Sequence, residues 1–492
     1  MRGANPKVIF TAVCCIVCTV LHAGNDLFLR SLNGYTGYTW HTGRQDSIVW
    51  GAGLSAVVSS GRYAPFWFSA NRDGMISVAP FSGNMSLCLG KRRTQYRRWM
   101  DYDFGVEIQG QVSTSKPEIL VRQLYASARL LVFDITVGIK PAMFGYYDPN
   151  RSLSSGGMLF SRNSRPIPHV FVGIEDYVPF PFLFGYVEVK GGITHGWFVD
   201  DVYVRNAYMH HKFAGVRLGG SLPVNVGYEF HHAAQWGGWS PVYGALGSSF
   251  DSFKNIFLAG SGGGMANDQL NAEGNHIGSQ VLFVEAKWQD WKLKAYWEMI
   301  FEDGPIYFMW DALNSHDGVW GITLSQNRFP FIKSFLYEYV NTTHQSGAFH
   351  DRDGIVYGGG DNYFNNSIYR NGWNFMYMTI GTPFITSPVY NGDMTVDCST
   401  LNNRVRLHHF GVEGDIYGYG YRVLASFVRN FGTYGTPRYS DNTALLFEVK
   451  KHFRRAWGLD FGLSLGMDFG SQFGNSVGAM FTVSKRGLIW RY

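Results

Sequence analysis

Charged residues are scarce in this chain. Asp, Glu, Lys and Arg together make up 16% of its 492 residues, while aromatic residues make up 17% and glycines number 60. This balance is unusual for a soluble protein of this size and suits a surface that faces lipid. The formal net charge of +5 is small for the length, so the composition gives no reason to expect a nucleic-acid partner.

Long hydrophobic runs are also missing after residue 23. A spanning helix needs about 20 consecutive apolar residues, and the mean hydropathy of −0.11 fits the lack of such runs. A helical membrane protein is therefore excluded. The remaining choices for an aromatic-rich, strand-patterned chain are a secreted β protein and a barrel in an outer membrane.

Residues 1–23 have the pattern of a secretory signal peptide. Arg2 and Lys7 precede the apolar stretch Val8–Leu21, and Leu21-His22-Ala23 resembles a cleavage site with a small residue at its end. The alternative is a membrane anchor, but about 14 apolar residues are few for a spanning helix. We predict a cleaved signal at 1–23 and one barrel domain over 24–492.

Cysteine is almost absent from the predicted mature chain. Three of the five cysteines lie in the signal, which leaves Cys88 and Cys398 far apart in sequence. Export makes a disulfide between them possible, but their spacing gives no reason to expect contact. We predict two thiols, and two cysteines do not predict a metal site.

What the chain does have is alternation, most clearly at Trp457–Phe469. Its odd positions are apolar throughout, and its even positions are Gly, Ser or Asp. A strand that crosses a bilayer and lines a wet lumen shows this pattern, with apolar residues facing out and polar residues facing in.

Similar segments recur along the whole chain. We expect strands at 47–60, 102–112, 120–130, 131–139, 183–190, 191–199, 203–212, 214–221, 224–230, 280–288, 291–302, 320–328, 330–342, 373–380, 405–415, 416–430, 443–451, 457–469 and 477–484. Long loops alternate with short turns, as in outer-membrane barrels, whose strand number is even. The prediction is an all-β, transmembrane antiparallel outer-membrane β-barrel of 18 strands, with 16 as the second choice.

The C-terminal residues Lys485–Tyr492 resemble the terminal signature of such barrels, in which aromatic residues occupy alternate positions. The apolar residues change parity between Val483 and Leu488. Either a bulge at Arg486-Gly487 changes the face, or the last strand ends near Lys485.

Three further segments resemble Wzi-type capsule assembly proteins, in the form found in Bacteroides-like bacteria. They are Ser60–Arg72 (SGRYAPFWFSANR), Leu153–Pro168 (LSSGGMLFSRNSRPIP), and Asn371-Gly372-Trp373 followed by Gly381-Thr382-Pro383-Phe384. The resemblance implies an outer-membrane barrel that binds capsular polysaccharide and supports capsule assembly at the cell surface, like a lectin and without catalysis. Family members outside this group carry a periplasmic helical bundle, but this sequence has no amphipathic helical stretch that would clearly supply one.

Aromatic and polar side chains in the long segments are the candidates for sugar binding. Sugars stack on aromatic rings and offer hydroxyls to Asp, Asn and Arg. The candidate contacts are Trp236, Trp239, Tyr307, Trp310, Asp311, Trp373, Arg162 and Arg165. An interface girdle or packing within the loops is the alternative for each aromatic residue.

Catalytic and metal-binding patterns are weak. His231-His232 and His408-His409 are adjacent pairs. Neighbours in a strand point to opposite faces, so neither pair could bind one metal ion from a strand. We predict no enzyme, no cofactor and no metal, but a monomer in the outer membrane with lipid around it and a largely filled lumen. A diffusion porin or sugar channel of the same architecture is the first alternative, and an outer-membrane hydrolase the second.

Overall fold

The computed structural model describes residues 47–91, 99–114, 117–141, 153–260, 273–302, 314–347, 351–352, 355–356, 359–392, 398–453 and 457–491. The predicted signal peptide at 1–23 lies outside these ranges. Within them, no helix has both the length and the apolar character needed to cross a membrane.

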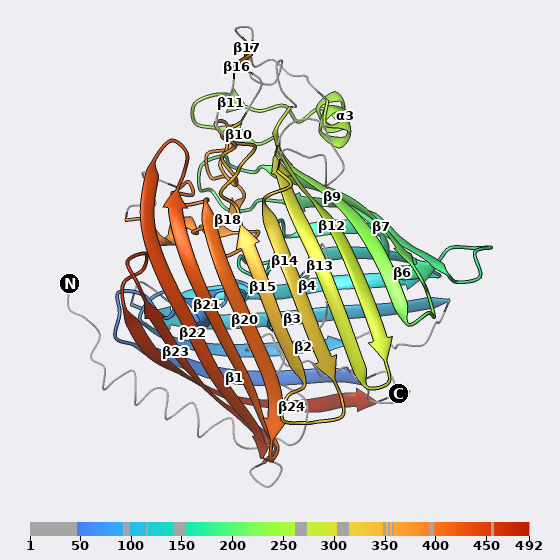
Figure 1. The fold of residues 1–492 in the computed structure, drawn as a ribbon, viewed down its shortest axis with the longest axis vertical. Coiled ribbons are helices and arrows are strands. Elements are labelled where there is room, and N and C mark those ends of the chain that lie inside the picture. The colour runs from blue at the N-terminus through green and yellow to red at the C-terminus, as the bar shows by residue number, and fades with distance from the viewer. Residues whose placement is uncertain are drawn as a thin grey trace.

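The described residues form one closed antiparallel sheet of 18 strands (Figure 1), as the sequence predicts. Each strand pairs with its neighbours in chain order, and the last strand, β24, pairs with β1. Closure leaves no unpaired sheet edge to face lipid. The strands are β1 (Ser47–Ser59), β2 (Phe81–Lys91), β3 (Met100–Ser113), β4 (Glu118–Leu130), β5 (Phe133–Ile139), β6 (His169–Pro179), β7 (Val187–Trp197), β8 (Tyr208–Leu218), β9 (Val224–Trp236), β12 (Asn275–Trp288), β13 (Trp291–Glu302), β14 (Gly318–Gln326), β15 (Ser334–Asn341), β20 (Val405–Ile416), β21 (Tyr419–Gly432), β22 (Pro437–Phe453), β23 (Leu459–Phe469) and β24 (Ser476–Arg491).

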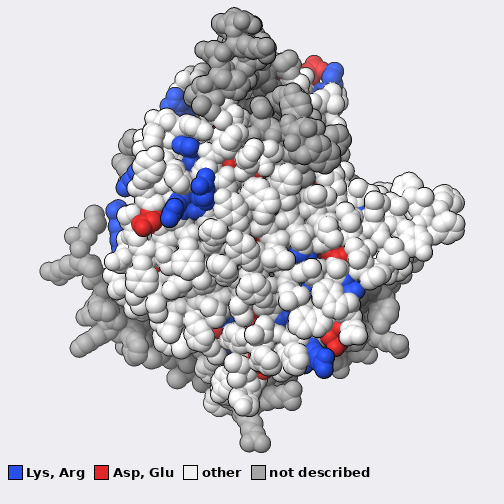
Figure 2. Space-filling view, viewed as in Figure 1, with Lys and Arg blue, Asp and Glu red and all other residues white. Residues whose placement is uncertain are grey.

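Side chains alternate between the two faces of the wall as predicted. On β23, Phe461, Leu463 and Leu465 are exposed on the outside, while Ser464 and Asp468 are buried inside. Figure 2 shows the result on one face of the molecule, where a broad band of uncharged side chains crosses the barrel between two borders that carry charge. The uncharged band is the surface that hydrocarbon would cover.

The two ends of the barrel differ. At one end, which we call the turn end, the connections β4–β5, β12–β13 and β20–β21 have two residues each, and β1 begins there. At the other end, the loop end, long connections follow β1, β5, β9, β13 and β15. Two two-stranded ribbons, β10–β11 (Trp239–Ser240, Gly244–Ala245) and β16–β17 (Asp351–Arg352, Ile355–Val356), and helix α3 (Phe250–Leu258) lie above this end in Figure 1.

Three strand predictions need correction. Residues 183–199 contain one wall strand, β7, and residues 203–221 contain one, β8, where two were expected in each. Residues 373–380 are not part of the wall, because they form the small hairpin β18–β19 (Asn374–Phe375, Met378–Thr379).

Two wall strands were missed. β2 alternates regularly, but Gly83 weakens its apolar face, and Cys88 and Gly90 lie on its polar one. β6 changes register between Ile174 and Val178, so its side chains do not keep one parity. These omissions nearly offset the extra segments, which is why the strand number was right.

The C-terminal strand runs to Arg491 as one element, so the tail is not separate. Its pairing with β1 shifts between Val49↔Leu488 and Ile48↔Trp490, which leaves Ile489 as the extra residue. The bulge lies at Ile489 and not at Arg486-Gly487, so it shifts the pairing of Trp490 but not that of Leu488.

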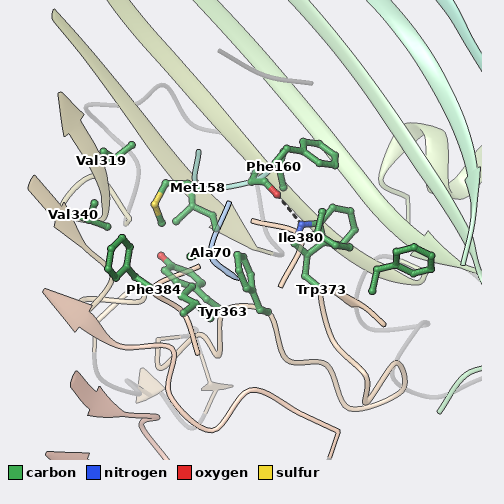
Figure 3. Packing of buried hydrophobic residues seen from close by; sticks show 14 of the residues in the cluster. Ala70, Met158, Phe160, Val319, Val340, Tyr363, Trp373, Ile380 and Phe384 are labelled. Atoms are coloured by element: carbon green, nitrogen blue, oxygen red, sulfur yellow. Dashed lines mark hydrogen bonds between the residues drawn. The ribbon is translucent and has the colours of Figure 1, made fainter. Parts of the chain in front are cut away.

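Three segments of the polypeptide fill the lumen of the barrel. Residues 61–80, 153–168 and 359–392, which we call the plug, fold inward and carry α2 (Phe66–Ser69), β18–β19 and the 3-10 turn η2 (Pro388–Tyr390). The plug residues in Figure 3, among them Met158, Phe160, Tyr363 and Trp373, are buried and belong to one apolar cluster with wall residues such as Val319. Packing inside the barrel, and not the lipid-facing surface, thus makes the core.

Candidate functional site

Buried charges connect the plug to the barrel wall. Asp73 of the plug accepts hydrogen bonds from Arg162 of the plug (Nε–Oδ1 2.7 Å) and from Arg122 of β4 (Nε–Oδ2 2.7 Å). Arg122 also reaches Glu107 of β3 at 3.0 Å. Burial opposes ionisation of Asp73, but the two guanidinium groups outweigh it and hold the pKa of Asp73 below its ordinary 3.8.

A second cluster of charges lies on β21 and β22. Glu448 accepts from Arg422 at 2.8 Å and from Arg72 of the plug at 3.4 Å, and it also pairs with Lys450. All four side chains are buried. Such a cluster fixes where the plug sits, because a charge displaced from it would be left buried without a partner.

Polar groups of the wall hold the plug at further points. Glu338 of β15 accepts from Ser154 Oγ at 2.7 Å and from Ser155 N at 2.6 Å. Asp468 of β23 accepts from the Phe66 amide at 2.7 Å, at the start of α2. The plug is therefore attached around the circumference of the wall by buried hydrogen bonds.

A small cavity remains beside Arg162 and Arg165, bordered by Asp73, Phe160 and Ile167, with a volume of about 40 Å³. Ligand pockets have volumes of roughly 300 Å³ or more, so this space cannot hold a sugar ring. Arg165 donates to Glu118 at 3.2 Å and contacts the Met376 sulfur at 3.0 Å. Of the predicted contacts, Arg162 and Arg165 are thus brought together, as part of the plug's attachment.

Two of the predicted tryptophans are buried. Trp373 donates from Nε1 to the Leu159 carbonyl at 2.8 Å and meets Phe160 edge to face at 5.6 Å. Trp236, at the loop end of β9, packs on Tyr208 and on Phe253 of α3. Both rings are used in packing, and neither offers a face to a ligand in this conformation.

Trp239 is different, because 45% of it is exposed. It lies in the ribbon β10–β11 and exchanges two backbone hydrogen bonds of 2.9 Å with Arg205, from the loop between β7 and β8. The exposed Arg205 guanidinium lies 5.6 Å from the centroid of the indole ring. A cation and a π face are presented together to solvent.

A second pair of the same kind lies next to the first. Arg370, an exposed residue of the plug, places its guanidinium 5.5 Å from the ring of Tyr203, two residues before Arg205. The hydroxyl of the neighbouring Tyr369 donates to the Gly237 carbonyl at 3.2 Å. Three chain segments are therefore joined into one surface, which we call the Arg–aromatic surface (Tyr203, Arg205, Trp239 and Arg370).

This surface suits an acidic or neutral sugar chain. Rings can stack the CH-rich faces of sugars, and guanidinium groups bind carboxylates or hydroxyls with paired hydrogen bonds. The sequence pattern predicts a strand over residues 203–212, so it identifies Trp239 without Tyr203 and Arg205 of the same surface. A tyrosine and an arginine two residues apart, Tyr203 and Arg205, are the signal that could have pointed to the surface.

Tyr307, Trp310 and Asp311 lie outside the described residues. Among the described residues, no group of three or more His, Cys, Asp or Glu side chains could hold a metal ion. The two rings of His231-His232 point to opposite faces, His231 to His211 at 3.3 Å and His232 to His276 at 2.9 Å. Cys88 lies in β2, and the thiol of Cys398 donates to the Arg370 carbonyl at 3.7 Å.

Comparison with known proteins gives a likeness of structure. No protein-family model matches the chain, and no curated protein matches it in sequence. Among solved structures it is similar to Wzi of Escherichia coli, an outer-membrane protein involved in group 1 capsule assembly and a carbohydrate-binding β-barrel. The TM-score is 0.56 at 12% identity, over 88% of this chain and 84% of that one.

Two porin structures also align along most of their length. Pseudomonas aeruginosa OccK5 (OpdH) has a TM-score of 0.48 at 9% identity, over 90% of this chain and 98% of that one. Acinetobacter baumannii OccAB4 has a TM-score of 0.47 at 8% identity, over 91% and 99%. The likeness to Wzi shows that this chain has the fold of an outer-membrane β-barrel, and at this identity it shows no more than the fold.

Proposed function

We propose that the protein is an outer-membrane barrel that binds capsular polysaccharide at the cell surface and supports the assembly and attachment of the capsule, without making or breaking bonds. The observation that carries this proposal is the exposed Arg–aromatic surface above a filled lumen. The loop end faces outward, as long loops do in outer-membrane barrels.

The filled lumen supports binding over transport. The plug is packed into the wall by apolar contacts and by buried charges such as the Asp73 and Glu448 clusters. A polymer or a free sugar could not pass this barrel without displacing that packing. The surface that remains for a ligand is the loop end, where Trp239, Arg205 and Arg370 are exposed.

The resemblance of the plug segments to Wzi-type proteins, and the fold shared with Wzi, favour capsular polymer as the ligand. We place Trp239, Arg205, Tyr203 and Arg370 in contact with it. Tyr307, Trp310 and Asp311 are proposed as additional contacts, and Arg162 and Arg165 as residues that hold the plug beneath the surface. One chain closes the barrel by itself, so we propose a monomer.

A binding experiment with matched tryptophans tests the proposal. Trp239→Ala removes an exposed ring of the surface, and Trp288→Ala removes a ring with the same exposure, 45%, at the turn end. With purified protein and the strain's own capsular polysaccharide, Trp239→Ala should weaken binding about tenfold, because stacking is worth roughly 1 to 2 kcal/mol. Trp288→Ala should bind like wild type. Equal affinities for all three proteins would overturn the proposal.

Deletion of the gene tests the role in the cell. We expect the polymer to be made but shed into the medium, because its surface contact is lost. Capsule that stays fully bound to the cells of the deletion strain would contradict a role in attachment.

A further inference from the structure

Two arginines stand directly opposite each other on the outside of the barrel near the loop end. Arg406 of β20 and Arg429 of β21 are cross-strand partners, and both are exposed on the outward face. Like charges placed directly opposite in a sheet destabilise it. The outward face of the wall therefore carries two adjacent positive charges that do not stabilise the folded barrel.

These charges have no carboxylate partner among the described residues. Arg406 donates to Asn341 Oδ1 at 3.4 Å and to Thr343 Oγ1 at 3.3 Å, both neutral. The nearby Arg404 donates to the Thr343 carbonyl and lies 3.9 Å from the centre of the Tyr434 ring. Among the described residues, no ion pair joins a carboxylate to any of the three guanidinium groups, which leaves them for an external anion.

One acid faces this group of arginines without neutralising it. Asp441 of β22 is the cross-strand partner of Arg429, but its Oδ1 accepts instead from Ser471, from the amide at 3.1 Å and the hydroxyl at 3.0 Å. Within the described chain, no ion pair joins Asp441 to Arg429. The net charge of the patch is positive.

An apolar track runs from the arginines toward the turn end on the same outward face. The cross-strand rows are His408 with Phe427, then Phe410 with Ala425 and Leu445, then Val412 with Val423 and Phe447. Phe427, Phe410, Val423 and Phe447 are exposed. Figure 2 shows blue arginine and lysine atoms gathered at the upper left, next to the uncharged band.

We propose that this part of the wall, Arg404, Arg406 and Arg429 above the Phe410–Phe427 track, binds a phosphorylated glycolipid of the outer leaflet. Guanidinium groups bind phosphate oxygens with paired hydrogen bonds. Acyl chains of the same molecule would lie along the apolar rows below, in continuity with the hydrocarbon that covers the rest of the wall. A phosphate on a lipid fits both halves of the surface, whereas a soluble polymer fits the charged half alone.

This inference is independent of the Arg–aromatic surface and of polysaccharide binding. It assigns a lipid partner to an outward-facing wall, so either proposal can fail without the other.

The test compares two lipids and two pairs of substitutions on the full-length protein in detergent. The probes are bisphosphorylated lipid A and the same lipid after removal of both phosphates, with binding measured by native mass spectrometry. The test variant is Arg406→Gln with Arg429→Gln. The control variant, Arg328→Gln with Lys287→Gln, removes two exposed cations at the turn end.

We expect wild type and the control variant to prefer the bisphosphorylated lipid, and the test variant to lose roughly thirtyfold in affinity for it, at about 1 kcal/mol for each arginine. Heat-dependent gel mobility verifies that all variants are folded. Equal binding of the two lipids by wild type, or an unchanged test variant, would overturn the inference. The inference would also be overturned if the test variant lost binding to soluble capsular polysaccharide but still bound the bisphosphorylated lipid. That result would assign the arginines to the polymer.

Discussion

The carboxyl group of Asp200 is buried in a connection at the loop end, and burial changes its pKa. Asp200, in the connection between β7 and β8, accepts a hydrogen bond from the Met376 amide at 2.7 Å. Its second oxygen, Oδ1, has no hydrogen-bond partner among the described residues. Burial raises the pKa of Asp200 from 3.8 to about 6.

The raised pKa predicts a cost of folding at neutral pH. Between pH 3.8 and about 6 the folded state binds the Asp200 proton more tightly than the unfolded state, so stability falls as pH rises through this range. Asp200→Asn keeps an acceptor for the Met376 amide and removes the charge. The variant should be more stable than wild type by about 3 kcal/mol at pH 8 and nearly equal to it at pH 4.

The effect is measured by the unfolding midpoints of both proteins in urea at pH 4 and pH 8. A difference between variant and wild type that is the same at pH 4 and pH 8 would show that the ionisation of Asp200 is not the cause.

Tryptophan exposure could not be predicted at the residue scale. Trp236, Trp239 and Trp373 have similar polar and glycine-rich surroundings in the sequence, yet Trp239 is exposed and the other two are buried. Their exposure depends on contacts with segments far away in the chain, such as the Leu159 carbonyl that receives the Trp373 hydrogen bond.

At the scale of elements, alternation predicted strands well where it was unbroken. β13 and β23 lie where they were expected, whereas β7 was divided at Gly191-Gly192. The structure explains this pair, because a Cβ at Gly192 would lie 2.4 Å from the ring of Phe171 on β6. The glycine makes room for an aromatic neighbour and does not end the strand.

The ion pairs between the plug and the wall predict that Glu448 of β22 is needed for stability. Glu448→Gln removes the anion that Arg72, Arg422 and Lys450 share, and buried cations without a partner destabilise a protein by about 3–5 kcal/mol. We expect a large fall in the unfolding midpoint, measured by circular dichroism in detergent.

Asp441→Asn is the matched control on the same strand, since Asp441 lies on the outward face and belongs to no ion pair among the described residues. It should shift the midpoint little. Equal shifts for the two variants would show that the Glu448 cluster does not hold the plug.

At the scale of the whole molecule, the filled lumen separates a binding protein from a channel. Wild-type protein in a planar bilayer should conduct far less than a diffusion porin, because the plug occupies the lumen. Replacing residues 361–391 by a short Gly/Ser linker leaves the pairing of β15 with β20 intact and should raise the conductance several-fold. Porin-like conductance of the wild type would instead favour the channel alternative.

The sequence by itself determined the barrel and the two faces of its regular strands, because each wall residue meets either hydrocarbon or the interior and period-2 alternation records that choice locally. The tertiary structure alone decided what fills the lumen and what stays exposed at the loop end. The burial of Trp373 and the pairing of Arg205 with Trp239 both join segments that are separate in the chain. Such contacts leave no periodic trace, since they depend on how loops fold back and on which strands close beside each other.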